Sequence, residues 1–298
     1  MRFLLSLQQD AKLFIYIHAL LMLFRCAFLV IYSGQLGNAG AEDVAEALWL
    51  GARISLKTAA FLVGFPFVFG TIPYALWKKW PAGGIRKILG SVAVGLMTLL
   101  FMVRIPYYEI FHQGFNIMLF NGMKDDRMAI WQTAVQQYQL WPRLFGALAL
   151  MAFFIWGLIK FLETPVYYPR HHVRILDMAA VVMVPVFAVF CRFGGAFHSD
   201  SGVPWESAAR TQYTVLNEAV LDDGQAMYRA YHTHARATQR AMRPISDGEL
   251  YEAIAALGGN PDAGTPITAF ERRTTAAPTR SPYICSSCRR HTAQTARR

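Results

Sequence analysis

Residues 13–32 read LFIYIHALLMLFRCAFLVIY, a run of mostly apolar residues near the start of the chain. About 20 such residues are what an α-helix needs to cross the roughly 30 Å hydrocarbon core of a bilayer. The run is longer than the apolar part of a signal peptide, and no small-x-small cleavage site follows it. It therefore predicts a first transmembrane helix, with His18 and Arg25 as polar residues inside it.

Four more apolar runs follow along the 298-residue chain. We expect further spans at residues 58–77, 88–103, 144–162 and 175–191. Only 16% of the residues are charged, against roughly 25% in soluble proteins. The sequence therefore predicts an all-α membrane protein with five transmembrane helices.

The distribution of Lys and Arg predicts the orientation, because cytoplasmic loops carry an excess of these residues. The N-terminus and the loops after the second and fourth spans are basic, whereas the loop after the first span is acidic. This pattern places the N-terminus inside and, after five crossings, everything beyond Cys191 outside. We expect a multi-pass protein of the cell inner (cytoplasmic) membrane with an extracytoplasmic C-terminus.

Two segments beside the spans have helical character. Residues 41–56 predict either an interfacial helix or an N-terminal extension of the second span. Residues 104–143 form the longest segment between spans, where Pro106 is expected to end the third helix. Beyond it we expect two short interfacial helices, at 107–118 and 128–138, on the outer surface.

The chain divides into three predicted regions. Residues 1–193 form the transmembrane domain, residues 194–257 an extracytoplasmic helical linker, and residues 258–298 a disordered tail. Within the linker, helices are expected at 212–237 and 245–257. Most of the net charge of +10 comes from the seven Arg in the tail, so the charge does not indicate a nucleic-acid partner.

Three segments occur in a set order around the spans: GARISLKTAAFLVGFPFV from Gly51, RIPYYEIFHQGFNIMLFNGMKDDRMAIW from Arg104, and RFGG followed by LNEAVLDDGQAMYRAY from Leu216. With them, residues 10–257 resemble the lipoteichoic acid synthase family. This family includes phosphoglycerol transferases of the alkaline phosphatase and sulfatase superfamily. The phosphoethanolamine transferases share a similar layout and are the nearest competing family.

The resemblance implies a large extracytoplasmic catalytic domain that begins just beyond Ala276. Its first strand would end in a metal-binding Glu, and a nucleophilic Thr would follow. Residues 277–298 match none of this, so no catalytic residue is carried over and no cofactor is expected in this chain. The family's divalent metal would belong to the catalytic domain. A shifted reading frame is one explanation of the tail, and a natural stop or an error in the gene model is the other.

We therefore expect the chain to be the membrane and linker half of such a transferase or sulfatase-like protein, truncated before the catalytic domain and inactive alone. The alternative is a stand-alone membrane scaffold that binds an extracytoplasmic partner through residues 212–257.

Five cations lie at the expected outer ends of the spans, against the usual bias toward the cytoplasm. In the family the donor is an anionic phospholipid presented at the outer leaflet, and a guanidinium can hold a phosphate bidentately. The candidates for binding lipid headgroups are Arg53, Lys57, Arg104, Arg143 and Arg192. The alternative is that these side chains snorkel to a polar interface.

Arg25 and His18 lie on one face inside the first span. Ionisable groups within a membrane usually face the bundle and pair there, and Glu109 is the expected partner of Arg25. The alternative is a direct role in handling the substrate.

No metal site is expected. His112, Asp125, Asp126 and His198 lack ligand spacing, and the Cys285/Cys288 pair has only His291 near it.

Overall fold

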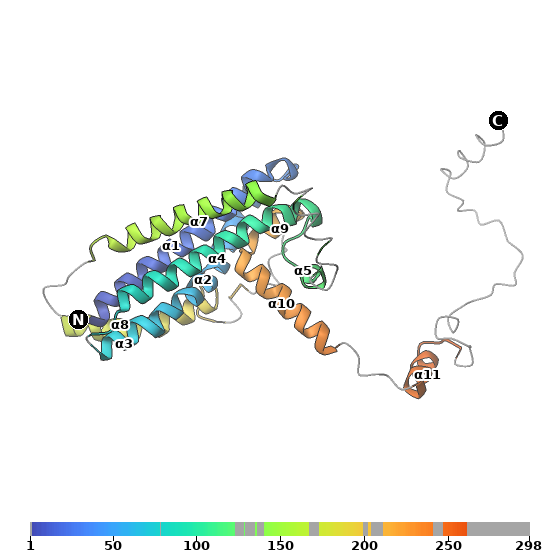
Figure 1. Cartoon of the computed structure of the whole chain (residues 1–298). Coiled ribbons are helices and arrows are strands. Elements are labelled where there is room, and N and C mark those ends of the chain that lie inside the picture. Colours follow the sequence, from blue (N-terminus) through green and yellow to red (C-terminus); the bar gives the residue numbers. More distant parts are fainter. Residues whose placement is uncertain are drawn as a thin grey trace, which may run out of the picture. The chain divides into compact units, whose positions relative to one another are not determined.

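The computed structural model describes residues 2–77, 79–122, 128, 135, 140–166, 173–198, 202–203, 211–240 and 247–260 (Figure 1). These residues contain no strand and include five helices that are long and apolar enough to cross a membrane. The five spans are α1 (Arg2–Ile31), α2 (Ala41–Pro66) with its continuation through η2 (Phe67–Thr71) and α3 (Ile72–Leu76), α4 (Ala82–Phe111), α7 (Leu140–Glu163) and α8 (Val173–Arg192). The predicted all-α membrane fold with five transmembrane helices is confirmed.

α1 and α4 form the centre of the bundle. Of their most apolar windows, 39% and 44% of residues are buried, against 11% in α7 and α8. Figure 1 shows α1, α2, α4 and α7 running side by side. Between α1 and α4, the rings of Phe24 and Phe101 stack with centroids 4.5 Å apart. The outer helices α7 and α8 therefore leave most of their apolar surface for contact with lipid.

The first two spans are longer than predicted. α1 starts at Arg2, and two polar residues of its first half, Ser6 and Asp10, are buried. Asp10 forms an ion pair there with Arg86 of α4 (2.6 Å). Helical structure runs unbroken from Ala41 to Leu76. Residues 41–56 are therefore an extension of the second span, which was one of the two predicted alternatives.

Pro106 does not end the third span, so that prediction is wrong. α4 continues beyond it and ends at His112, which adopts a left-handed conformation (φ 50°). Proline removes one helical hydrogen bond, but the next turn is fixed by packing. Tyr108 is fully buried, with its ring 5.0 Å from that of Phe28 and 4.6 Å from that of Tyr32.

The predicted helix at 212–237 is two helices, α9 (Thr214–Val220) and α10 (Asp223–Arg240). The break lies at Leu221, whose backbone is extended (ψ 131°). The side chain of Asp222 then caps α10, because its Oδ1 accepts the backbone N–H of Gln225 (2.9 Å).

Two compact units divide the chain, Met1–Thr238 and Gln239–Arg298. The first holds the bundle, α5 (Ile117–Gly122), α9 and nearly all of α10, and the second holds α11 (Asp247–Ala256). Most of the expected surface helix at 128–138 and most of the tail at 258–298 lie outside the described residues.

Candidate functional site

α9 and the first turn of α10 pack against the bundle at the end opposite to the N-terminus (Figure 1). Their apolar side chains are almost wholly enclosed, with at most 4% exposure for Val215, Leu216, Ala219, Val220 and Leu221. The start of the predicted linker is therefore part of the folded bundle.

Arg25 of α1 holds the C-terminal end of α9. Its Nε donates to the carbonyl of Ala219 (2.9 Å), and its Nη2 donates to the carbonyl of Val220 (3.2 Å) and the hydroxyl of Ser55 (2.7 Å). The last carbonyls of a helix have no partner within it, and a cation near them is favourable. Arg25 therefore supplies the donors that the short helix α9 lacks.

The predicted pairing of Arg25 with Glu109 is wrong. Glu109 instead accepts a hydrogen bond from Arg143 of α7 (3.3 Å). This pair is about two-fifths exposed, so Glu109 lies near the surface while Arg25 lies inside.

Gly51 of α2 makes room for Arg25. A Cβ at this position would overlap the Nε and Cζ atoms of the Arg25 side chain. Gly51, which begins the segment GARISLK, is thus required by the close approach of a guanidinium to the α2 backbone.

Arg104 of α4 forms a second attachment. Its Nη1 lies 2.9 Å from Asp223, its Nη2 donates to the carbonyl of Glu218 (2.6 Å), and its guanidinium lies 4.1 Å from the ring centroid of Phe28. Arg104 and Asp223 are each 3% exposed. Burial raises the pKa of the Asp223 carboxyl, and the Arg104 guanidinium offsets part of that rise.

Thr58 of α2 completes the arrangement. Its hydroxyl donates to the carboxylate of Asp222 (2.9 Å) and accepts from the side-chain amide of Gln225 (3.1 Å). We call this set the linker cluster: Arg25, Ser55, Thr58, Arg104, Asp222 and Asp223. It joins three transmembrane helices to one short stretch of the linker.

Two other predicted headgroup ligands hold the segment after α8. Arg53 Nε donates to the carbonyl of Gly194 (2.7 Å), and Lys57 Nζ donates to the carbonyl of Val203 (2.6 Å). Gly194 has φ +64°, and a Cβ there would approach the carbonyl oxygen of Arg53 to 3.1 Å. Gly194, the first glycine in RFGG, is therefore needed for this contact.

The five candidate cations thus occupy different surroundings. Arg104 lies in the linker cluster, Arg53 and Lys57 contact the segment after α8, and Arg143 pairs with Glu109. Arg192 at the end of α8 is exposed. The role of these residues in binding headgroups stays a prediction.

His18 lies beside the linker cluster, where its ring is hydrogen-bonded to the backbone of Ser55. Its ring stacks on that of Phe14 with centroids 6.1 Å apart. Its Nδ1 atom is buried and has no partner in the described part of the chain, and the same holds for Nε of Arg104.

The linker cluster consists of contacts within the chain. The residues that the structure describes include no group of three His, Cys, Asp or Glu side chains that could hold a metal. The Arg and Asp side chains of the cluster are engaged with one another and with backbone carbonyls.

Sequence reasoning missed Asp222 and Asp223. The signal was present, because these two adjacent acids directly follow the apolar residues Ala219–Leu221 in LNEAVLDDG. Buried acids and cations that lie within a span or at its end can satisfy each other.

Comparison of the chain with protein-family models, curated proteins and solved structures finds no match.

Proposed function

We propose that residues 10–257 are the membrane anchor and linker of a lipoteichoic-acid-synthase-like phosphoglycerol transferase or sulfatase-like protein. The observation that carries the proposal is the contact of Arg25 and Arg104 with residues 218–223. Two of the segments with the family resemblance, those starting at Arg104 and Leu216, meet there. The remaining segment, which starts at Gly51, supplies Ser55 and Thr58 to the same cluster.

In this proposal the bundle fixes where the linker leaves the membrane. A catalytic domain attached by a free linker would sample many heights and orientations above the bilayer. A linker that starts from a rigid point restricts these heights and orientations. It thereby raises the effective concentration of the domain at the lipid headgroups. The catalytic Thr and the divalent metal belong to that domain.

We further propose the cell inner membrane as the location, with the linker on the outer side. The basic loops after the second and fourth spans support this orientation. Anionic phospholipids are then the lipid partners. Arg143 and Arg192 are the candidate headgroup ligands that are exposed at the ends of their spans.

Complementation tests the proposal. The purified chain is reconstituted in vesicles that contain an anionic phospholipid, with and without a separately expressed catalytic domain of the family. We expect transfer of phosphoglycerol only when both parts are present, and a lower rate with Arg104→Gln. A rate that is the same with and without the chain would contradict an anchoring role.

A membrane scaffold is the second candidate. One observation favours it: Tyr228 and Tyr231 of α10 are 58% and 59% exposed. Exposed aromatic residues are common anchors in protein interfaces. A scaffold would bind an extracytoplasmic partner through α10 without restoring any transfer activity, so the complementation assay separates the two.

A further inference from the structure

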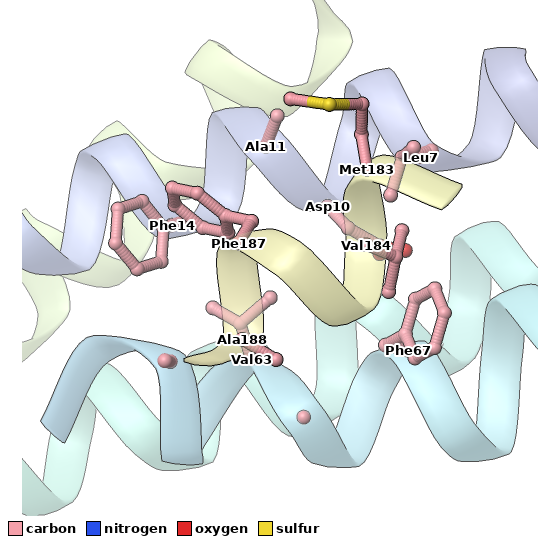
Figure 2. Close-up of a pocket in the computed structure, with 12 residues that line it drawn as sticks. Leu7, Asp10, Ala11, Phe14, Val63, Phe67, Met183, Val184, Phe187 and Ala188 are labelled. Carbon is pink, nitrogen blue, oxygen red and sulfur yellow. The ribbon is translucent and has the colours of Figure 1, made fainter. Parts of the chain in front are cut away.

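A cavity of about 370 Å³ lies between α1, α2 and α8, away from the linker cluster (Figure 2). Small residues from each helix form part of its wall: Ala11 of α1, Ala60 and Gly64 of α2, and Ala188 of α8. A Cβ on Gly64 would meet no atom within 4 Å. The cavity therefore arises from small side chains in three helices.

Contacts on either side of the cavity hold it open. At one end the backbone N–H of Leu4 in α1 donates to Asp177 of α8 (3.1 Å). At the other end the rings of Phe14 and Phe187 meet edge to face, with centroids 5.1 Å apart. α8 is thus fixed to α1 at two points and cannot close onto it between them.

The wall of the cavity is apolar apart from Asp10. The carboxylate of Asp10 is already bonded to Arg86 and to the hydroxyl of Thr71, so it needs no further partner. Apolar cavities stay dry. The surrounding helices cross the bilayer, where hydrocarbon is the material available to fill such a space.

The dimensions decide between hydrocarbon and a neighbouring helix. The lining residues of α1 run from Leu7 to Phe14, a rise of about 10 Å. A helix with its side chains is about 10–12 Å across, whereas α1 and α8 are in contact on both sides of the cavity, through Leu4 with Asp177 and Phe14 with Phe187. A hydrocarbon tail is narrow enough to enter.

We propose that this cavity binds one acyl tail of a membrane phospholipid, held between α8 and the α1–α2 pair. The site is separate from the proposed role as an anchor and from any headgroup contact at the outer face. Val63 is the diagnostic residue, because it lines the cavity and is only 8% exposed. An adduct on Val63 therefore marks a tail that has entered the cavity.

The test uses the full chain reconstituted in phosphatidylcholine vesicles with a trace of phospholipid that carries a photoreactive diazirine in the middle of its tail. After irradiation, mass spectrometry of peptides locates the adducts. We expect an adduct at Val63 and its neighbours in the cavity. Adducts confined to the exposed faces of α7 and α8, or a crosslink between two copies of the chain at this site, would overturn the proposal.

Gly64→Leu fills the cavity from a position where the backbone has room for a side chain. It is expected to remove the adduct at Val63 while leaving adducts on α7 unchanged. Gly146→Leu is the matched control, because Gly146 on α7 is exposed and also has no neighbour within 4 Å of a Cβ. Ala188→Phe fills the same space from α8 and should act like Gly64→Leu. An adduct at Val63 that survives both filling variants would also overturn the proposal.

Discussion

Arg104 and Asp223 form a buried ion pair, and such a pair is most sensitive to the loss of one member. Removal of one charge leaves the other buried without compensation, at a typical cost of about 3–5 kcal/mol. We expect a loss of that size in the free energy of unfolding for Arg104→Gln, measured by denaturation of the purified chain in detergent. Arg192→Gln is the control and should change it by no more than about 0.5 kcal/mol, because Arg192 is exposed.

The Arg104–Asp223 pair also predicts how the stability of the Arg104→Gln variant depends on pH. Burial raises the pKa of Asp223, and Arg104 opposes the rise, so Arg104→Gln should raise this pKa further. A carboxyl with a higher pKa in the folded state binds more protons there than when unfolded, and stability then falls as pH rises. We expect Arg104→Gln to lose more stability at about pH 8 than at about pH 5. The double variant with Asp223→Asn should lack this extra slope, and an identical slope in both would contradict the explanation.

Gly51 gives a third prediction at the level of single residues. Gly51→Ala should destabilise the protein, because the added Cβ overlaps Arg25 and displaces it from α9. Gly64→Ala in the same helix meets no atom and should be neutral or stabilising by up to about 1 kcal/mol, since Ala favours helix. If both substitutions have the same effect on thermal unfolding, the close approach of Arg25 to α2 is not as described.

Some of these residues could be recognised from the sequence and some could not. Arg25 and Arg104 stood out because cations are costly within or beside a span. Their partners lie 194 and 119 positions away along the chain. The spacing of residues on one helix carries no information about such distant contacts. The prediction of Glu109, which is nearer to Arg25 along the chain, is therefore wrong.

Among the elements, the junction of α9 and α10 depends most on one side chain. Asp222 both caps α10 and accepts the hydroxyl of Thr58. Asp222→Ala should cost about 1 kcal/mol from the cap alone, plus the loss of the buried contact with Thr58. We expect faster hydrogen exchange in the first turn of α10 with no change in the middle of α4. Unchanged exchange at Gln225 would contradict the capping role.

The spans themselves were predictable because apolar runs of about 20 residues have few alternatives. The ends of the spans were not predictable, and the reason differs between the start of α1 and the end of α4. α1 extends to Arg2 because Arg86 neutralises Asp10, and α4 passes Pro106 because Tyr108 packs on α1. In both places a tertiary contact outweighs the local signal.

At the level of the whole molecule, the bundle and the first part of the linker are one folded unit, Met1–Thr238. The sequence predicted a boundary at residue 193, where the apolar runs end. Hydropathy could not reveal that α9 returns to the bundle, because its attachment depends on buried polar contacts as well as on apolar packing.

We propose that the linker leaves this unit on the outer side of the membrane, held by Arg25 and Arg104. Labelling of Thr233→Cys in intact cells with a maleimide that cannot cross membranes tests it most directly, in a chain whose four native cysteines are replaced. Thr233 is exposed on α10. We expect full labelling in intact cells and no increase after permeabilisation. Labelling that occurs only after permeabilisation would place the linker on the cytoplasmic side and contradict this orientation.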